Sequence, residues 1–169
     1  MGWKNLKEHY RVEHIVHVVD GDICIGSPYI SKIIIISPDG VFKKRHTSGN
    51  NDLARIQSEM DADLPKLIEI IASPDHFEKT IPIFTFKGGE VREKHCEELG
   101  WPNVTHDGCL MYDNTFFTSK NEAVEYAKKE IEYGVKMYHR LIGEKTEELK
   151  KLQEELAAEE AISERLSQM

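Results

Sequence analysis

The sequence lacks the features that would place the chain in a membrane or in an oxidising compartment. No apolar run approaches the roughly 18 residues that a membrane-spanning helix needs, and the opening MGWKNLKEHY has no apolar segment of the secretory kind. Leu6 stands where an N-terminal myristoylation signal carries Ser or Thr. The chain has only three cysteines, an odd number. We therefore expect free thiols in a reducing cytoplasm and no membrane association.

Positive charge is also scarce. The 169 residues carry a formal net charge of -8, with 22 Lys and Arg against 30 Asp and Glu. This balance disfavours nonspecific attraction to nucleic acid or to anionic lipid. It is compatible with mimicry of a nucleic-acid backbone, although acidic proteins are common and such mimics are rare. The composition favours a protein or a small molecule as the partner.

The first part of the chain has the pattern of strands. Apolar runs alternate with turn signals, and they predict strands at residues 14–19, 22–26, 32–37 and 41–45, with Asp-Gly turns after the first and the third. The continuous isoleucine run at 33–36 is typical of a central strand covered on both faces.

Short helices and further strands are expected next. A polar loop at 46–52 leads to a helix at 53–60 capped by Asn51 or Asp52, and a second helix begins with Asp63 as its cap and Pro65 in its first turn. Later elements are strands at 80–87 and 90–93, a helical turn at 96–99 and a strand at 109–116. Together these elements predict an α+β fold with a small, mostly antiparallel sheet and two or three short helices.

The C-terminal part has a helical pattern from about residue 119 to 166. Seven apolar residues recur in steps of four and three, namely Ile131, Val135, Tyr138, Ile142, Leu149, Leu152 and Leu156. This spacing predicts a long, partly coiled-coil-like helix, interrupted once by Lys145. We expect an α+β domain at 1–118, a helical tail at 119–169 and a homo-oligomer formed through the tail. Because Gly143 weakens the helix, a hairpin folded back at Gly143 and a single solvated helix are the alternatives.

Residues 94–109, KHCEELGWPNVTHDGC, concentrate cysteine and histidine. Thiolate and imidazole are the preferred ligands of zinc, and a thiol beside an imidazole can serve as nucleophile and base. The spacing of His95, Cys96, His106 and Cys109 matches no common zinc pattern, and no flanking residues match a thiol-enzyme signature. The run from His106 to Gly108 is typical of a turn. We therefore predict no metal, no cofactor and no catalytic residue, and the spacing leaves open whether the four side chains converge.

Two kinds of binding residue are candidates. Lys43, Lys44 and Arg45 form the densest positive run and could bind a phosphate or an acidic partner, although they lack P-loop spacing and lysines also protect exposed sheet edges. A polar run that includes Ser48 and Asn50 follows them. The candidate protein-interface residues are Trp101, Tyr112, Tyr138, Ile142, Leu149, Leu152 and Leu156.

The stretch WPNVTHDGCLMYDNTFFTSKNEAVEYAKKE, residues 101–130, resembles small accessory proteins of bacteriophages and prophages. Those proteins are similar in having a small α/β body and a charged helical tail. The resemblance implies a bacterial host cytoplasm and action by binding, and it assigns no site residue. Phage proteins of this class include inhibitors of host defence systems.

These observations lead to two expectations about function. The first is a non-enzymatic protein that binds a host or phage macromolecule, with inhibition of a host defence system as one form of that activity. The alternative is a small enzyme, or a small-ligand or metal-binding protein, with a site around His106, Asp107 and Cys109 together with Lys43 and Arg45. Binding of nucleic acid through the basic run is disfavoured by the net charge.

Overall fold

The computed structural model describes residues 1–47, 49 and 51–169. Ser48 and Asn50 of the expected polar loop lie outside the described residues. The chain forms two compact units, Met1–Ala123 and Val124–Met169, and each is treated by itself below. No helix in the described part of the chain is long and apolar enough to cross a membrane.

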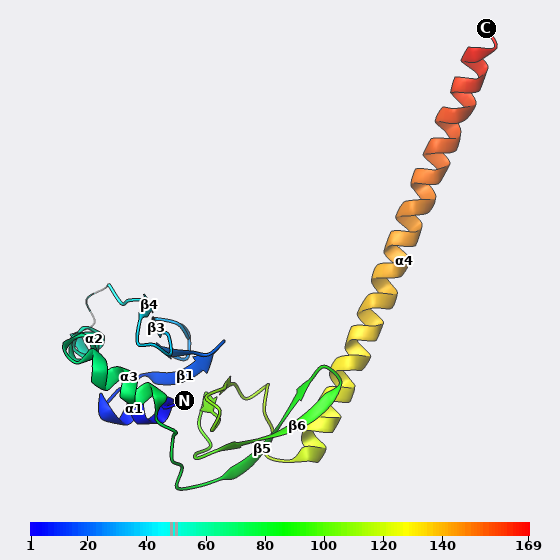
Figure 1. Ribbon diagram of the computed structural model, residues 1–169. Helices are drawn as coiled ribbons and strands as arrows, with labels where there is room; N and C mark the ends of the chain where they lie inside the picture. Colours follow the sequence, from blue (N-terminus) through cyan, green and yellow to red (C-terminus); the bar gives the residue numbers. More distant parts are fainter. Residues whose placement is uncertain (48, 50) are drawn as a thin grey trace. The chain divides into compact units, whose positions relative to one another are not determined.

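The first unit mixes helices with small antiparallel sheets (Figure 1). In chain order its elements are α1 (Trp3–His9), β1 (Ile15–Val19), β2 (Asp22–Gly26), β3 (Ile34–Ile36), β4 (Phe42–Lys44), α2 (Asn51–Ala62), α3 (Leu64–Ala72), β5 (Ile81–Lys87), β6 (Glu90–Cys96), β7 (Asn103–Val104) and β8 (Leu110–Met111). Strands β1 to β4 form one antiparallel sheet in sequence order, while β5 pairs with β6 and β7 with β8. With the long helix α4 (Lys120–Ser167), this arrangement confirms the predicted α+β class.

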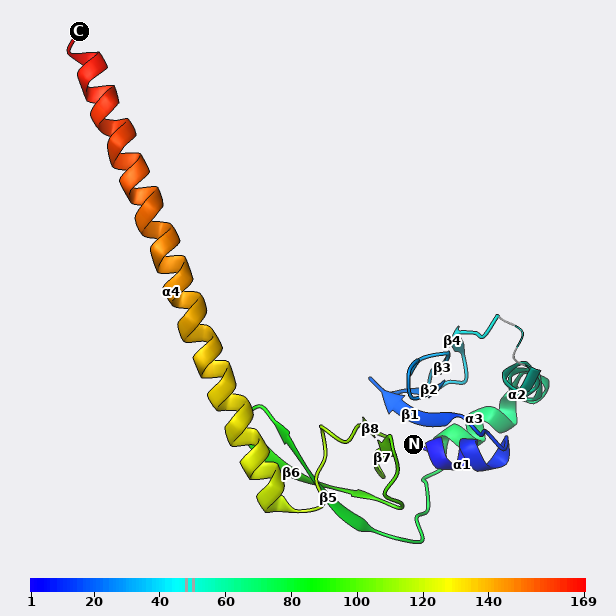
Figure 2. The same cartoon turned by 180° about the vertical axis from the view of Figure 1, so that it is seen from behind.

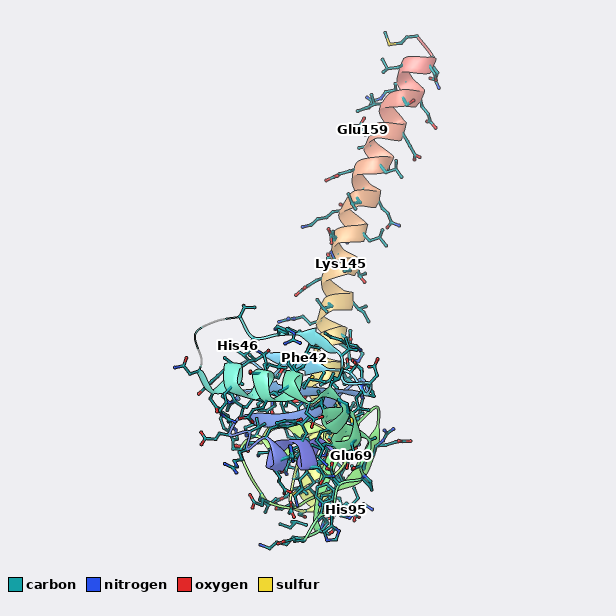
Figure 3. The ribbon with its side chains drawn as sticks, turned by 60° about the vertical axis from the view of Figure 1, so that its left-hand side comes forward. Phe42, His46, Glu69, His95, Lys145 and Glu159 are labelled. Carbon is teal, nitrogen blue, oxygen red and sulfur yellow. The ribbon has the colours of Figure 1, made fainter. Side chains whose placement is uncertain are left out.

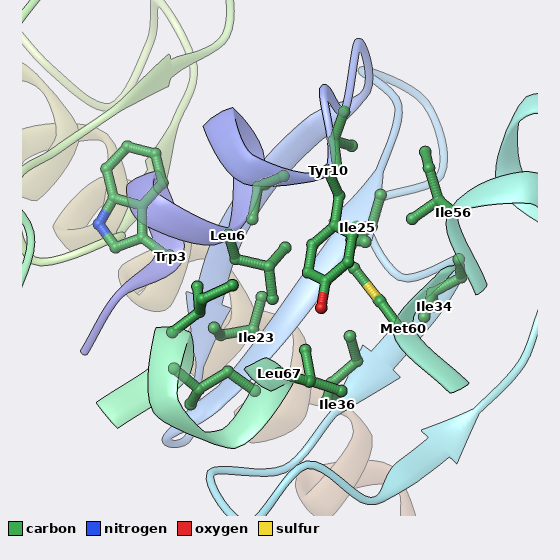
Figure 4. Close-up of a cluster of buried hydrophobic side chains, with 14 of the residues drawn as sticks. Trp3, Leu6, Tyr10, Ile23, Ile25, Ile34, Ile36, Ile56, Met60 and Leu67 are labelled. Atoms are coloured by element: carbon green, nitrogen blue, oxygen red, sulfur yellow. The ribbon is translucent and has the colours of Figure 1, made fainter. Parts of the chain in front are cut away.

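The core of the first unit lies on one face of the four-stranded sheet (Figure 4). Alternate residues of β2 and β3 supply a layer of isoleucines, and α1, α2 and α3 cover it. The fully buried members are Leu6, Val16, Ile23, Ile25, Ile34, Ile36, Leu53, Ile56, Met60, Leu67 and Ile71. Burying one such side chain contributes roughly 1.5–3 kcal/mol, so this layer is the main source of stability in the unit.

Strand β3 is an inner strand of the sheet, as predicted, but its two faces are covered unequally. Ile34 and Ile36 are fully buried in the core, whereas Ile33 and Ile35 are only half-buried. The loop from Ser27 to Ser31 lies over the second face of the sheet at His17 of β1. It passes so close to β2 that a Cβ on Gly26 would lie 2.3 Å from the Ser31 carbonyl oxygen, so only glycine fits at position 26.

Several predicted boundaries are wrong for local reasons. Helix α2 begins at Asn51, so both predicted caps, Asn51 and Asp52, lie inside the helix. The helical turn expected at 96–99 does not form, because β6 continues to Cys96, which pairs with Ile81. The strand expected at 109–116 is limited to β8, because Thr115 closes a turn by donating its backbone N–H to the Tyr112 carbonyl at 2.7 Å.

The second unit is a single helix without a break (Figures 1 and 2). Helix α4 passes through Gly143, so the alternative of a hairpin folded back there is wrong. One glycine costs up to about 1 kcal/mol in a helix, and ion pairs spaced three or four residues apart offset this. Examples are Glu132–Lys136 and Lys145–Glu148, each at 2.6 Å.

Helix α1 was not predicted, and its N-terminus is capped from a distant part of the chain. Gly2 precedes the helix and has no side chain to offer. Asp75 supplies the acceptor instead, with Oδ1 2.9 Å from the Asn5 backbone nitrogen. Burial raises the pKa of Asp75, while the amide groups of Asn5, Lys4 and Trp3 act in the opposite direction. The docked position is tight, because a Cβ on Gly2 would lie 2.1 Å from the Ile70 carbonyl oxygen.

Replacing Asp75 with alanine is expected to destabilise the first unit by about 1–2 kcal/mol, as for a lost N-cap. Urea unfolding followed by circular dichroism measures the change. Asp75→Asn keeps an acceptor oxygen and is expected to lose less. The exposed Asp113→Ala serves as the matched control and is expected to leave the midpoint unchanged. An equal midpoint for Asp75→Ala and the wild type would show that this carboxylate is not the cap.

Candidate functional site

The cysteines and histidines of residues 94–109 are close in space but face different surroundings. The residues after β6 fold back along it. Thr105 forms an isolated β-bridge with Cys96, and His106 donates its backbone N–H to the His95 carbonyl at 2.8 Å. The His95 and His106 rings are 6.2 Å apart. His106, however, is stacked on Phe77 at 3.9 Å, and its Nε2 lies 3.1 Å from the Lys79 carbonyl oxygen.

The two thiols turn inward. Cys96 is fully buried, and Cys109 packs against the same small cluster, which also holds Ile83 and Met111. In the part of the chain that the structure describes, no group of three or more His, Cys, Asp or Glu side chains is placed to hold a metal ion. The strands therefore separate the thiols from the imidazoles instead of bringing all four side chains to one point.

The run around His106 is a turn held by its own side chains, as its composition predicted. Gly108 has φ +79° and donates its backbone N–H to the Thr105 carbonyl at 2.7 Å. The Thr105 hydroxyl accepts from the Cys109 backbone N–H at 3.0 Å and donates to Asp107. Burial raises the pKa of the Asp107 carboxyl, but hydrogen bonds from Lys94 and Thr105 lower it by more, so the net shift is downward. The Lys94 Nζ lies 2.6 Å from Asp107. Asp107 is thus a structural anion.

The basic run does not present its three charges together. Lys43 pairs with Asp22 at 2.7 Å, and the Lys44 ammonium donates to the Lys32 carbonyl at 2.5 Å. Arg45 makes two hydrogen bonds of 2.7 Å to Asp61 and lies over the Phe42 ring at 4.0 Å. An anionic ligand would have to displace these internal partners. None of these contacts involves His106. They therefore do not connect Lys43 and Arg45 to His106, as the alternative small-ligand site would require.

Trp101 and Tyr112 do meet at the surface. Trp101 is 55% exposed, and its ring contacts Tyr112 edge-on at 6.4 Å. The Tyr112 hydroxyl donates to the Pro28 carbonyl at 3.2 Å. This bond ties the aromatic pair to the loop that carries two further exposed apolar residues, Tyr29 and Ile30. We refer to Trp101, Tyr112, Tyr29 and Ile30 as the aromatic surface.

A cavity of about 540 Å³ lies between α1 and the segment from Glu97 to Val104. Its wall carries charges of both signs, including Lys4, which pairs with Glu97 at 2.7 Å. Asn103 also lines the cavity, and its buried Nδ2 has no partner among the described residues. The mixed wall gives no preference for an anion or a cation.

The third cysteine and a buried histidine form a pair that the sequence did not suggest. His17 on β1 lies directly opposite Cys24 on β2, both are buried, and His17 contacts the loop that contains Ser31. The His17 Nε2 is 2.8 Å from the Ser31 carbonyl oxygen, so it must carry the proton. Burial lowers the pKa of His17 and raises the pKa of Cys24. Both shifts favour neutral side chains, the reverse of what a thiolate–imidazolium pair needs.

The seven predicted seam residues of α4 share one stripe of the helix, and all are between 50% and 63% exposed. They are Ile131, Val135, Tyr138, Ile142, Leu149, Leu152 and Leu156. We refer to them as the apolar seam. The 3.5-residue period keeps the seam on one side of the helix, and in the first unit no comparable row of large apolar side chains is exposed among the described residues.

Comparison with protein families, with curated proteins and with solved structures finds no match for this chain. The functional inference therefore rests on the residues of this chain and their contacts alone. Among them, the apolar seam and the aromatic surface are exposed for contact, whereas the cysteines, the histidine–cysteine pair and the basic run are engaged within the first unit.

The burial of His17 predicts a loss of stability in mild acid. An exposed imidazole has a pKa of about 6.5, and the pKa of His17 is lower, so the unfolded chain takes up the proton first. The contribution of neutral His17 to the free energy of unfolding is fully present above about pH 6.5. As the pH falls below about 6.5, this contribution decreases by at most about 1.4 kcal/mol for each pH unit. Urea unfolding at pH 7.5 and pH 5.5 measures the loss. His17→Gln keeps an N–H donor but cannot titrate, so its loss should be smaller; an equal loss would contradict the assignment.

Proposed function

We propose that this chain is a non-enzymatic binding protein that forms a homo-oligomer through α4 and contacts a macromolecular partner with its aromatic surface. The observation that carries the proposal is the apolar seam, seven exposed apolar side chains in one stripe of an uninterrupted helix. Contiguous exposed apolar surface marks sites of association, and a heptad stripe is the form that fits a second helix.

The energetic reason is the cost of leaving the seam in water. Each large apolar side chain contributes roughly 1.5–3 kcal/mol when it is fully buried, and the seam covers roughly four heptads. The ion pairs along α4, such as Lys136–Glu132 and Arg140–Glu144, are exposed and contribute little. Burial of the seam against another helix is therefore the largest gain available to this unit.

The biological setting rests on the sequence. The resemblance of residues 101–130 to phage accessory proteins includes Trp101 and Tyr112 of the aromatic surface, and it supports a host or phage protein as the partner. Inhibition of a host defence system is the form of binding that this setting favours, and the bacterial host cytoplasm is its location. The net charge of -8 favours a protein over nucleic acid.

The small-ligand alternative around His106, Lys43 and Arg45 has less support. His106 is covered by Phe77, and Lys43 and Arg45 form ion pairs with Asp22 and Asp61. Binding there would require these contacts to open first.

A single seam substitution tests the proposed association. Leu152→Glu places a charge in the seam and is expected to reduce the oligomer to the 19.4 kDa of one chain, because the carboxylate would lose its hydration in the pair. Sedimentation equilibrium measures the mass. Ala157→Glu adds the same charge on another side of the helix and should keep the oligomer. If the wild type itself has the mass of one chain at high micromolar concentration, association through α4 is wrong.

A further inference from the structure

Three charged residues lie in the same stripe as the apolar seam. Continuing the steps of four and three places Lys128 before Ile131, Lys145 after Ile142 and Glu159 after Leu156. All three are exposed (Lys145 and Glu159 are labelled in Figure 3). Charges at seam positions specify orientation and register in helix pairs at some cost in stability, so their placement identifies the arrangement.

We infer that α4 pairs with the α4 of a second copy in antiparallel orientation, centred between Gly143 and Glu144, with Lys128 of each chain beside Glu159 of the other. This inference rests on the association proposed above. It adds the occupant of the seam, its direction and its register.

A parallel pair in register is disfavoured by charge. Each seam residue then faces its own copy, which sets Lys128 against Lys128, Lys145 against Lys145 and Glu159 against Glu159. At the flanks of the seam, Glu155 would face Glu160 of the second copy. Like charges in a coiled-coil seam or across its flanks are repulsive, and within the seam no opposite charges meet in this arrangement.

The antiparallel pair removes the conflict between seam charges at both ends. Across its flanks Glu125 faces Glu160 of the second copy, as Glu155 does in the parallel pair, so the seam charges distinguish the two arrangements. With its centre between Gly143 and Glu144, Ile131 faces Leu156, Val135 faces Leu152 and Tyr138 faces Leu149 of the second copy, and each contact occurs twice by symmetry. Lys128 then faces Glu159, again twice, so that opposite charges close each end of the apolar layers.

Only Lys145 remains among apolar side chains in this register, where it faces Ile142 of the second copy. Its aliphatic stem can cover that isoleucine while the ammonium reaches the edge of the pair. The position of the ammonium supports this, since Nζ already lies 2.6 Å from Glu148 on its own helix. Moving the centre one step toward the C-terminus would set Glu159 against Val135, and one step toward the N-terminus would set Lys128 against Leu152. Each shift places a charge against an apolar residue.

Distances between spin labels on the full chain test the direction. Cysteines introduced by Ala161→Cys lie about 35 positions apart along the axis of the antiparallel pair, which at 1.5 Å per residue is about 50 Å. A parallel pair would give less than about 25 Å. Arg140→Cys lies near the centre and is expected to give a short distance in either direction, so it controls for labelling. Unsubstituted protein gives the background from Cys109, the half-buried native thiol.

Charge reversal tests the register. Lys128→Glu and Glu159→Lys should each raise the dimer dissociation constant roughly tenfold, since two symmetric attractions become repulsions. The double variant should restore the wild-type value. Lys128 also pairs with Glu125 of its own helix at 2.8 Å, and the double variant does not restore this contact. Recovery of the wild-type dissociation constant would therefore report the contact between the two chains. Lys129→Glu, in the neighbouring position outside the seam, is the control.

Each outcome distinguishes this inference from the proposed function. A long distance at position 161 together with recovery in the double variant supports the pair as described. A short distance in a dimer overturns the direction and leaves association through α4 intact. A long distance without recovery overturns the contact of Lys128 with Glu159. A single-chain mass for the wild type overturns both the pairing and the proposed function.

Discussion

The first unit depends on a single layer of isoleucine side chains on one face of a small antiparallel sheet. Ile23, Ile25, Ile34 and Ile36 are fully buried there, and the three short helices exist as a cover for them. A sheet buried on one face leaves the other open, and the loop from Ser27 to Ser31 covers His17 there, opposite the buried Cys24. Burial favours the neutral forms of both side chains, so His17 and Cys24 serve packing and not catalysis.

Local patterns predicted the elements whose causes are local. The Asp-Gly turns and apolar runs identified β1 to β4, and Asp63 caps α3 as expected, with its carboxylate 3.0 Å from the Lys66 backbone nitrogen. Helix α1 escaped prediction because it is only seven residues long and its capping acceptor, Asp75, comes from far along the chain. The long helix was predicted as well, and the alternative of a break at Gly143 fails because a propensity cost near 1 kcal/mol does not decide the course of a helix of 48 residues.

The candidate sites show the same division between local and distant causes. Spacing was enough to predict a turn from His106 to Gly108, because Thr105, Asp107 and Gly108 bond within it. Pairing of Lys43 with Asp22 and of Arg45 with Asp61 follows from tertiary contacts, which no local pattern shows. Tyr29 and Ile30 were missed as surface residues because only the bond from Tyr112 to the Pro28 carbonyl brings their loop to the aromatic pair.

Helix α4 raises a different question, which is why its apolar residues form a stripe at all. Helix propensity does not depend on which side of the helix a residue occupies, and ion pairs three or four residues apart stabilise a helix on any side. A stripe gains free energy only when a second surface covers it. The charges within the stripe then favour one surface over another, because like charges disfavour the in-register parallel copy and the order of Lys128 and Glu159 matches an antiparallel one. A helix selected for solubility alone would have no reason to keep that order.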